Sequence, residues 1–424
     1  MKITELYIYP IKSLRPLSVQ RARLRREGPE HDRRFMLLKV EADGSHRNIQ
    51  PLHFPESVLF HQAIEDDSVV VTYRDPSEKK PRPTPELQEL QGDTAAAALR
   101  VPLRPSIEGL AAVDIRLLGS TTTAYRMGEP YDAWFSSRFG YKVILVYIGD
   151  RRRPVLAHSP NNNNNDKVPR QQRSWLSAIV SYVTGSGGEV GEQQRQQQGG
   201  EDFLTFSEAA PFLVTSRASL RDVNSRLPQR EDVDMMVFRP NIVVDDDYDD
   251  DSGDGNYCDG DDDETQVSTE SGGGQQQQRR GRAQTETQMP ASPQPKLEAW
   301  DEDFWGELRI GGSHRLALTA NCARCLSINI DYDTGRPAEG ERGAVLKKLM
   351  GDRRVDSGNR WSPIFGRYAF LLPTSPASDD DTAAARPEMM TQGGVVEVDV
   401  AVGDEVVVTR RISDRDVWSW PKST

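Results

Sequence analysis

Two of the chain's three cysteines lie in one short segment, Asn321-Cys-Ala-Arg-Cys325, with an arginine between them. A thiolate is a soft ligand that suits soft or high-valent metals, and a neighbouring arginine favours the ionised form. The planar guanidinium can also bind a phosphate through paired hydrogen bonds. The segment therefore has the residue types to hold both a metal and the anionic tail of a cofactor.

Three other interpretations of the Cys322–Cys325 spacing stay open. A structural zinc site needs four ligands, but Cys258 lies in an acidic stretch and the six histidines show no paired spacing. A thioredoxin-type pair normally opens a helix after a strand, whereas the flanking runs 314–319 and 326–330 alternate like strands. The third interpretation is two buried structural cysteines in a hairpin.

Basic and amide side chains occur at three further positions where strands begin or end. Lys12 and Ser13 follow a strand and a proline, and Arg33 precedes a buried strand. Arg239 and Asn241 flank a rigid proline. Each alone is more often part of a surface ion pair or a turn, but together they can bind one phosphorylated, hydrogen-bond-rich organic ligand.

The composition indicates a folded part that is close to electrically neutral. The formal net charge is -12, and residues 245–264 contain twelve acidic and no basic side chains, which accounts for the whole of it. A neutral folded part argues against a nucleic-acid partner.

The sequence favours a reducing compartment and no membrane anchor. Three cysteines at irregular spacing do not form a disulfide framework. The chain starts directly with a strand pattern, and no run approaches the roughly 18 apolar residues of a membrane helix. We therefore expect a cytoplasmic protein without a membrane partner.

The predicted fold class is mainly β with α+β elements, in two barrel-like domains. Residues 1–150 form the first domain and residues 174–411 the second, with an Asn-rich linker at 157–173. Low-complexity inserts at 184–200 and 245–296 interrupt the second domain. They cannot bury enough apolar area to offset the entropy of ordering, so we predict long disordered insertions.

Periodicity and turn signals predict the individual elements. The main expected strands are Ile3–Tyr9, Arg34–Val40, Ser68–Tyr73, Asp114–Leu118, Val143–Ile148, Pro211–Thr215, Phe238–Val244, His314–Thr319, Leu326–Ile330, Tyr368–Leu372 and Val395–Thr409. The expected helices are Asp132–Phe139, Trp175–Val183, the segment from the cap Ser216 to Arg226, and Gly343–Met350. Asp43-Gly44 predicts a hairpin turn.

Five motifs in chain order resemble those of the MOSC-domain proteins (molybdenum cofactor sulfurase C-terminal domain) with their N-terminal β-barrel domain, and among them the amidoxime-reducing components. The motifs are Tyr9-Pro-Ile-Lys-Ser13, Asp32-Arg-Arg-Phe35, Phe238-Arg-Pro-Asn-Ile-Val243, Asn321-Cys-Ala-Arg-Cys325 with Asp331-Tyr-Asp-Thr-Gly335, and Ser362-Pro-Ile-Phe-Gly-Arg-Tyr368.

The resemblance implies a molybdenum–pterin cofactor (Mo-molybdopterin) whose metal is bound by Cys325. The residues that it implies for cofactor binding are Lys12, Ser13, Arg33, Glu208, Ala209, Ala210, Arg239, Asn241, Ala323, Arg324 and Tyr368. The three alanines carry no side-chain donor, so they can contact the cofactor only through backbone N–H groups. Cys322 is not implied as a ligand.

The implied activity is a two-electron reduction of N-hydroxylated, amidoxime-type small molecules. The resemblance also implies a b-type cytochrome and an NADH-dependent flavoprotein reductase as separate electron donors.

The sequence differs from these relatives in two respects. Animal amidoxime reducers carry an N-terminal targeting and anchoring segment that we do not see, and the chain has no room for the desulfurase domain of the sulfurase.

Two alternative functions stay open on the same residues. A carrier of the molybdenum cofactor or of sulfur would use Cys325 as a persulfide site, without catalysis. A thiol-redox protein would use Cys322 and Cys325 together.

Overall fold

The computed structural model describes residues 1–76, 98–160, 202–228, 231–246, 296–373 and 397–420. The predicted insert 184–200 and the predicted helix Trp175–Val183 lie outside the described residues. So do the insert 245–296 and the linker 157–173, apart from the few residues at their ends.

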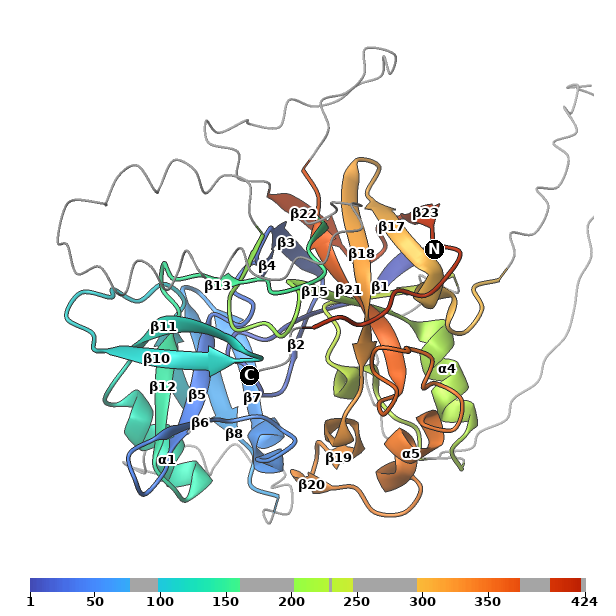
Figure 1. Ribbon diagram of the computed structural model, residues 1–424. Coiled ribbons are helices and arrows are strands. Elements are labelled where there is room, and N and C mark those ends of the chain that lie inside the picture. Colours follow the sequence, from blue (N-terminus) through green and yellow to red (C-terminus); the bar gives the residue numbers. More distant parts are fainter. Residues whose placement is uncertain (77–97, 161–201, 229–230, 247–295, 374–396, 421–424) are drawn as a thin grey trace, which may run out of the picture.

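The largest element is a mixed sheet whose strand order is β2-β1-β16-β15-β21-β18-β17-β23 (Figure 1). Its strands are β1 (Lys2–Ile8), β2 (Leu17–Val19), β15 (Phe212–Ser216), β16 (Ile242–Asp245), β17 (Trp305–Ile310), β18 (His314–Ala323), β21 (Ile364–Leu371) and β23 (Val406–Arg411). Buried apolar side chains from these strands, such as Ile3, Val214 and Trp305, form one continuous core.

The pairing register of this sheet brings distant loops to one edge. β1 runs antiparallel to β16, with Leu6 opposite Ile242, and β15 runs parallel to β16, with Val214 opposite Ile242. The end of β1 therefore lies beside the starts of β15 and β16. As a result, the loops at residues 9–13, 208–211 and 239–241 converge there.

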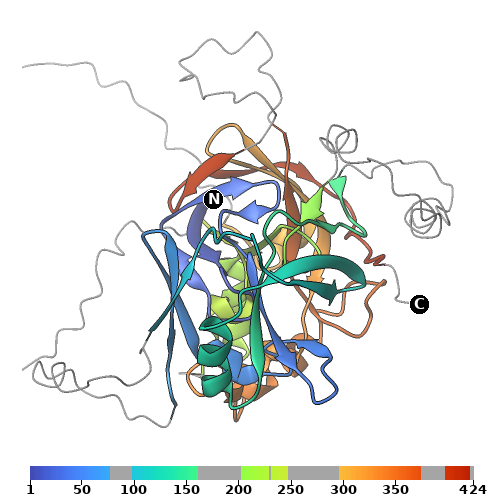
Figure 2. The ribbon, with the colours of Figure 1, turned by 90° about the vertical axis from the view of Figure 1, so that its left-hand side faces the viewer.

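The rest of the N-terminal half forms smaller antiparallel sheets, which lie on the left of Figure 1 and toward the viewer in Figure 2. Their orders are β10-β11-β12-β5-β6 and β7-β8-β9. The strands are β5 (Phe35–Val40), β6 (His46–Asn48), β7 (Phe60–Glu65), β8 (Ser68–Tyr73), β9 (Ala98–Pro102), β10 (Ala112–Leu117), β11 (Ser120–Arg126) and β12 (Val143–Tyr147). Helix α1 (Tyr131–Phe139) packs beside β12 and contributes Trp134 and Phe135 to a second core.

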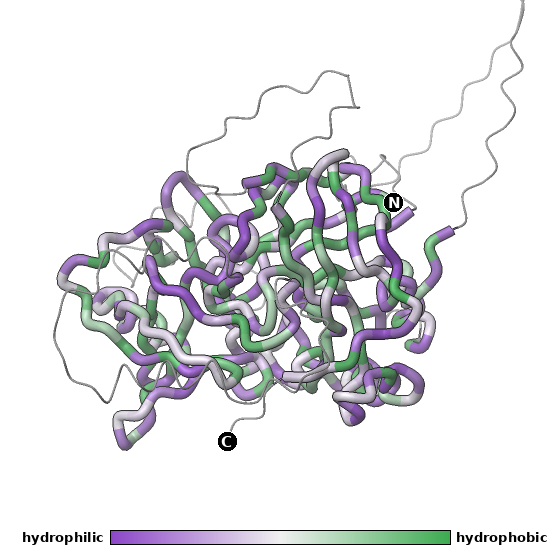
Figure 3. The backbone as a smooth tube through the Cα atoms, turned by 45° about the horizontal axis from the view of Figure 1, so that its top comes forward, coloured by the Kyte–Doolittle hydropathy of each residue, from purple (hydrophilic) through white to green (hydrophobic). Residues whose placement is uncertain are grey.

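Short strands connect the two halves. β3 (Arg21–Arg25) pairs with β4 (Gly28–Pro29) and with β22 (Val398–Ala401), while β13 (Arg153–Pro154) pairs with β14 (Phe203–Leu204). Hydrophobic residues recur along the strands and hydrophilic residues dominate many loops (Figure 3). The prediction of a mainly β fold with few helices is confirmed.

Most predicted elements are present at nearly the expected positions. The hairpin around Asp43-Gly44 joins β5 to β6, and Gly44 has φ 82°. Helix α1 ends at Gly140, whose φ is 76°. Ser216 caps helix α4 (Arg217–Ser225) by accepting a hydrogen bond from Ser219 N. Helix α5 (Val345–Leu349) lies within the predicted range 343–350.

Two strand predictions at the motifs were wrong, one over its first residues and the other over all but its last residue. The run Phe238–Val244 is a strand only from Ile242, because Asp234 caps a 3-10 helix, η5 (Met235–Phe238), and Arg239 then adopts φ 55°. The run Leu326–Ile330 is a 3-10 helix, η7 (Leu326–Asn329), followed by the short strand β19 (Ile330–Asp331). Local capping and tight turns override the apolar alternation in both segments.

The predicted domain boundary at residue 150 stays a prediction. The large sheet contains strands from both sides of this boundary. Strands β1 and β2 come from the first 20 residues but belong to the large sheet, and β22 pairs with β3. The first strand of the chain is therefore part of the core that the C-terminal half builds.

A buried carboxylic acid links helix α4 to the large sheet. Glu302 has no exposed surface, and its Oε2 accepts hydrogen bonds from Ser219 Oγ at 2.7 Å and Ser216 Oγ at 3.0 Å. Burial, together with the nearby Asp303, raises the pKa of Glu302 to about 7. The folded protein thus holds this group protonated over a range where the unfolded chain, with a pKa of 4.5, has released the proton.

Glu302 should make the stability of the fold depend on pH. The folded state binds a proton on Glu302 that the unfolded chain has released. The contribution of Glu302 to the free energy of unfolding is therefore largest below pH 4.5 and is lost as the pH rises to about 7. We expect the free energy of unfolding of wild type, relative to Glu302→Gln, to fall by on the order of 2 kcal/mol between pH 5 and pH 8. Urea unfolding of both proteins at the two pH values measures this difference, and an equal difference at both would contradict it.

Candidate functional site

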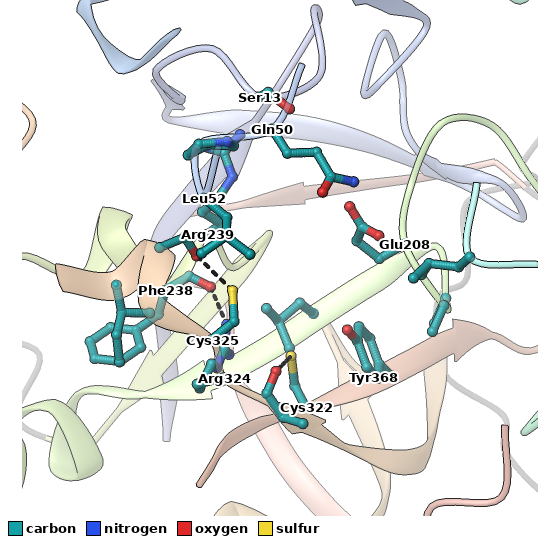
Figure 4. A pocket seen from close by; sticks show the side chains of 18 of the residues that line it. Ser13, Gln50, Leu52, Glu208, Phe238, Arg239, Cys322, Arg324, Cys325 and Tyr368 are labelled. Carbon is teal, nitrogen blue, oxygen red and sulfur yellow. Dashed lines mark hydrogen bonds between the residues drawn. The ribbon is translucent and has the colours of Figure 1, made fainter. Parts of the chain in front are cut away.

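All twelve predicted site residues line one cavity of about 360 Å³ (Figure 4). They come from both halves of the fold and are Lys12, Ser13, Arg33, Glu208, Ala209, Ala210, Arg239, Asn241, Ala323, Arg324, Cys325 and Tyr368. Further lining residues that we did not predict include Gln50, Leu52, Leu118, Cys322 and Trp418. The motifs, which are up to about 350 residues apart in the chain, thus meet at one place.

The two cysteines differ in access. Strand β18 ends at Ala323, and Cys325 is the N-cap residue of the 3-10 helix η7. Its thiol is exposed, and Sγ lies 3.2 Å from Ser327 Oγ. Cys322 lies inside β18 and is only 4 % exposed. Burial raises the pKa of the Cys322 thiol, and Arg324 offsets this only in part. Cys325 is therefore the accessible sulfur of the pair.

Arg324 braces the cysteine segment against the neighbouring loop. Its Nη1 donates to Phe238 O at 2.6 Å, and its Nε donates to Phe365 O at 2.9 Å. The side chain is 8 % exposed. At least three of its five N–H groups are used on backbone carbonyls, because Nη2 also donates to Phe365 O. The main effect of Arg324 in this structure is to fix the position of the loop that carries Arg239.

Lys12 and Glu208 form an ion pair between the two halves of the fold. Lys12 is 4 % exposed, and burial lowers the pKa of its ammonium group to about 8, although Glu208 works in the opposite direction. Burial would raise the pKa of Glu208, but Lys12, Arg153 and Arg33 outweigh it and hold that pKa below its ordinary value. Glu208 keeps 38 % of its side chain exposed, so its carboxylate stays within reach of solvent.

Two guanidinium groups lie over the ring of Tyr9. The Arg33 carbon lies 4.4 Å and the Arg239 carbon 4.5 Å from the ring centroid. Arg33 is also paired with the buried Asp32, and Arg239 Nη2 donates to Leu14 O at 3.0 Å. These contacts hold two positive charges at the cavity wall before any ligand arrives.

Asn241 is held entirely by protein groups in this structure. Its Oδ1 accepts from Arg33 Nη1 and from Leu213 N, each at 3.3 Å, and its Nδ2 donates to Tyr7 O at 3.2 Å. The side chain is 1 % exposed. It therefore fixes the end of β1 and the orientation of Arg33.

The backbone is unusual around the cavity. Among the described residues, eight that are not glycine have positive φ, and four of them, Ser13, Arg33, Leu118 and Arg239, line the cavity. Such conformations cost about 1–3 kcal/mol each and persist where the surroundings enforce them. Their concentration here supports a functional role for the cavity.

Arg153 holds the loop at residues 205–208 in place, and no sequence pattern predicted this role. It is fully buried, and it donates to Thr205 O at 3.2 Å, Glu208 O at 2.7 Å and Ser207 O. These bonds fix the loop that presents Glu208, Ala209 and Ala210. Nothing in the run Arg151-Arg152-Arg153 distinguishes the buried arginine from its exposed neighbours.

The residues that line the cavity suit a metal that is already coordinated by an organic cofactor. No group of three or more His, Cys, Asp or Glu side chains in the described part of the chain could hold a metal ion. A metal at Cys325 would thus take most of its ligands from outside the protein, and the cations at Lys12, Arg33 and Arg239 suit an anionic group. A volume of about 360 Å³ lies within the range of cofactor sites.

Family comparisons match both halves of the chain. The MOSC N-terminal beta barrel domain matches residues 1–142, and the MOSC domain matches residues 201–280 and 293–407. Mitochondrial amidoxime-reducing component 1 of Mus musculus is 24% identical over 378 residues, which is 87% of this chain and 77% of that protein.

Other relatives are similar at comparable levels. Mitochondrial amidoxime reducing component 2 of Bos taurus is 21% identical over 86% of this chain and 77% of that protein. Mitochondrial amidoxime-reducing component 1 of Homo sapiens is 30% identical, but over only 40% of this chain and 35% of that protein. These names place the relatives in mitochondria, which does not agree with the expected cytoplasmic location. Across the described residues, no helix has the length and apolar character to cross a membrane.

Removing Arg153 should destabilise the fold far more than removing its neighbour. Arg153→Met leaves three or more buried carbonyls without their donor, so we expect a loss of about 2–4 kcal/mol in the free energy of unfolding. The matched control Arg152→Met removes an exposed side chain whose guanidinium carbon lies 4.0 Å from the Phe203 ring centroid, and it should cost about 0.5 kcal/mol. Urea unfolding measures both, and similar losses would contradict the assigned role of Arg153.

Proposed function

Because this chain belongs to the MOSC-domain family, we propose that it is a molybdenum-cofactor reductase of N-hydroxylated, amidoxime-type small molecules. The observation that carries the proposal is the exposed Cys325 thiol in a cavity whose wall holds Lys12, Arg33 and Arg239. The relatives named amidoxime-reducing components support the reaction class.

In this proposal Cys325 is the protein ligand of the metal. The bound cofactor supplies the two-electron chemistry that reduces an N–OH group to N–H with release of water. Arg33, Arg239 and Lys12 would neutralise the cofactor phosphate, and Ser13 and Tyr368 would fix its orientation. Asn241 would act through Arg33, whose guanidinium it holds. Ala209, Ala210 and Ala323 line the same cavity and could contact the cofactor only through backbone groups.

The release of water consumes two protons, and two groups in the cavity are suited to handle them. Lys12 has a pKa of about 8, so its Nζ is mostly protonated near neutral pH but can release a proton. Its partner Glu208 has a lowered pKa and stays ionised near neutral pH, so it holds the Lys12 ammonium in place while solvent, which reaches the partly exposed carboxylate, replaces the proton. We assign this ion pair to proton supply on the Glu208 side of the cavity.

We further propose that the electrons come from separate proteins, a b-type cytochrome and its NADH-dependent flavoprotein reductase. Cys325 lies at an accessible position, next to Leu326, which is 59% exposed. A donor protein can therefore approach close to the proposed metal position.

The same exposed thiol also supports one alternative, a carrier that holds sulfur as a persulfide on Cys325. A dithiol redox protein receives less support. Cys322 is buried with a raised pKa, so it is poorly placed to attack a disulfide as a thiolate.

Metal and pterin analysis of the purified protein tests the proposal. From a host that makes the cofactor, wild type should contain near-stoichiometric molybdenum and pterin, and Cys325→Ala should lose the metal, because its only protein ligand is gone. The matched control Cys322→Ser should keep metal, pterin and amidoxime reduction with an added electron donor.

Other outcomes would redirect the assignment. Full molybdenum content in Cys325→Ala would show that Cys325 is not the ligand. Folded wild type without metal or pterin, but with a persulfide on Cys325 by mass spectrometry, would establish the carrier. Loss of activity in Cys322→Ser would favour the dithiol function.

A further inference from the structure

Two aromatic side chains keep accessible surface at the wall of the cavity. The described residues that line it include four aromatic ones, Phe212, Phe238, Tyr368 and Trp418. The two phenylalanines are buried in the cores of the fold, whereas Tyr368 and Trp418 are only partly buried. The ring centroids of Tyr368 and Trp418 are 6.1 Å apart. These two rings are therefore the aromatic surface that the cavity offers to a ligand.

The indole of Trp418 also carries a hydrogen-bond donor that the protein does not use. Within the part of the chain that the structure describes, its N–H group has no partner, whereas that of Trp420 donates to Leu118 O at 2.9 Å. Indole N–H groups usually find an acceptor when they become buried. The Trp418 side chain can thus give a ligand both apolar contact and one hydrogen bond.

Trp418 belongs to the C-terminal segment, residues 415–420, which polar groups of the C-terminal half hold in place. Arg367, which has no exposed surface, forms an ion pair with Asp416. Asn321 Nδ2 donates to Asp416 O at 2.8 Å, and Trp418 N donates to Asp356 Oδ1 at 3.0 Å. Asn321 lies on β18 and Arg367 on β21, so two strands that line the cavity anchor the segment.

The N-terminal half holds the other end of the segment. Ser419 N donates to His158 Nε2 at 3.2 Å, and the ring of His158 stacks on Trp418 with centroids 5.0 Å apart. Trp420, whose N–H group binds Leu118 O, also stacks on Trp418, at 5.5 Å. The segment therefore contacts both halves of the fold, as the cavity does.

These contacts position Trp418 before any ligand arrives. The end of a chain is usually poorly ordered unless it is tied down, and here both halves tie down the six residues of which Trp418 lines the cavity. The packing beneath it is also close, because a Cβ atom added at Gly358 would lie 2.0 Å from Trp418 O. A ligand that contacts the indole therefore has little ordering cost to offset.

We propose that Trp418 is a further cofactor-binding residue and that the C-terminal segment is the clasp that holds it against the pterin. The accessible part of the indole gives the pterin apolar contact, and the N–H group donates to one of its nitrogen or oxygen acceptors. The proposal rests on the proposed function for the identity of the ligand. It goes beyond that function, because the resemblance implies no residue after Tyr368 and the match to the MOSC domain ends at residue 407.

Pterin retention by the loaded full chain tests the clasp without an assay of activity. Loaded wild type and variants are diluted, and the pterin that leaves the protein is oxidised and followed by its fluorescence. Trp418→Ala should release pterin about tenfold faster than wild type, the factor that a loss of ~1.4 kcal/mol gives. Trp418→Phe keeps a ring but loses the N–H group, so it should release pterin about threefold faster.

Two further variants and a second measurement separate contact from folding. Gly358→Ala should also speed release, although the indole is intact, because the added Cβ displaces the segment. Trp361→Ala is the matched control and should release pterin like wild type, since this tryptophan is 81% exposed and does not line the cavity. A cofactor that binds only the folded state raises its stability, so Trp418→Ala should lower the melting temperature of the loaded protein more than that of the cofactor-free protein. Equal lowering of both would give Trp418 a purely structural role and overturn the proposal.

The outcomes distinguish this proposal from the proposed function. Equal release rates in wild type and Trp418→Ala, or an equal acceleration in Trp361→Ala, would overturn the clasp and leave the reductase standing. Faster release from Trp418→Ala, together with no reduction of N-hydroxylated compounds by loaded wild type, would support the clasp and overturn the proposed reaction. Folded wild type without any pterin would overturn both.

Discussion

The antiparallel pairing of β1 with β16 is the constraint on which the rest of the site depends. It joins residues near the start of the chain to residues about 240 positions later, with Leu6 opposite Ile242. Because of this register, Lys12 and Ser13 follow β1 at the edge where Arg239 and Asn241 precede β16. A shift by one residue would turn the side chains of β1 to the opposite face and separate the two groups. The site is therefore a product of sheet register more than of any single loop.

Burying several cations at this edge costs desolvation free energy, and partner groups within the protein offset that cost. Desolvating several buried positive charges is unfavourable unless each has a partner. Asp32 pairs with Arg33, Glu208 pairs with Lys12, and Arg33 and Arg239 both contact the ring of Tyr9. These partners allow the cationic wall to exist without a ligand, and they leave Glu208 partly exposed on the side that faces the cavity. An entering anion would therefore meet charges that are already positioned, so that little reorganisation energy is needed.

The sequence predicted the strands better than the connections between them. Alternation and turn chemistry located β1, β5, helix α1 and the cap at Ser216, because these signals are local. The 3-10 helices before Arg239 and after Cys325 were missed, since a capping Asp234 and a tight turn outweigh short apolar runs. Arg153 and Trp418 could not be identified as site residues. Their importance comes from contacts with residues more than 30 positions away, and no local pattern encodes those contacts.

The different environments of Cys322 and Cys325 constrain the chemistry more than their spacing does. A redox pair needs two sulfurs that can both react. Cys322 is buried within strand β18, whereas Cys325 is exposed because the strand ends at Ala323. The turn that exposes Cys325 is fixed by Arg324, which bonds to carbonyls on both neighbouring segments. One exposed sulfur beside a preformed cationic wall is the arrangement that a singly ligated metal with an anionic cofactor requires. The arginine between the cysteines therefore joins the segment that carries Cys325 to the loop that carries Arg239.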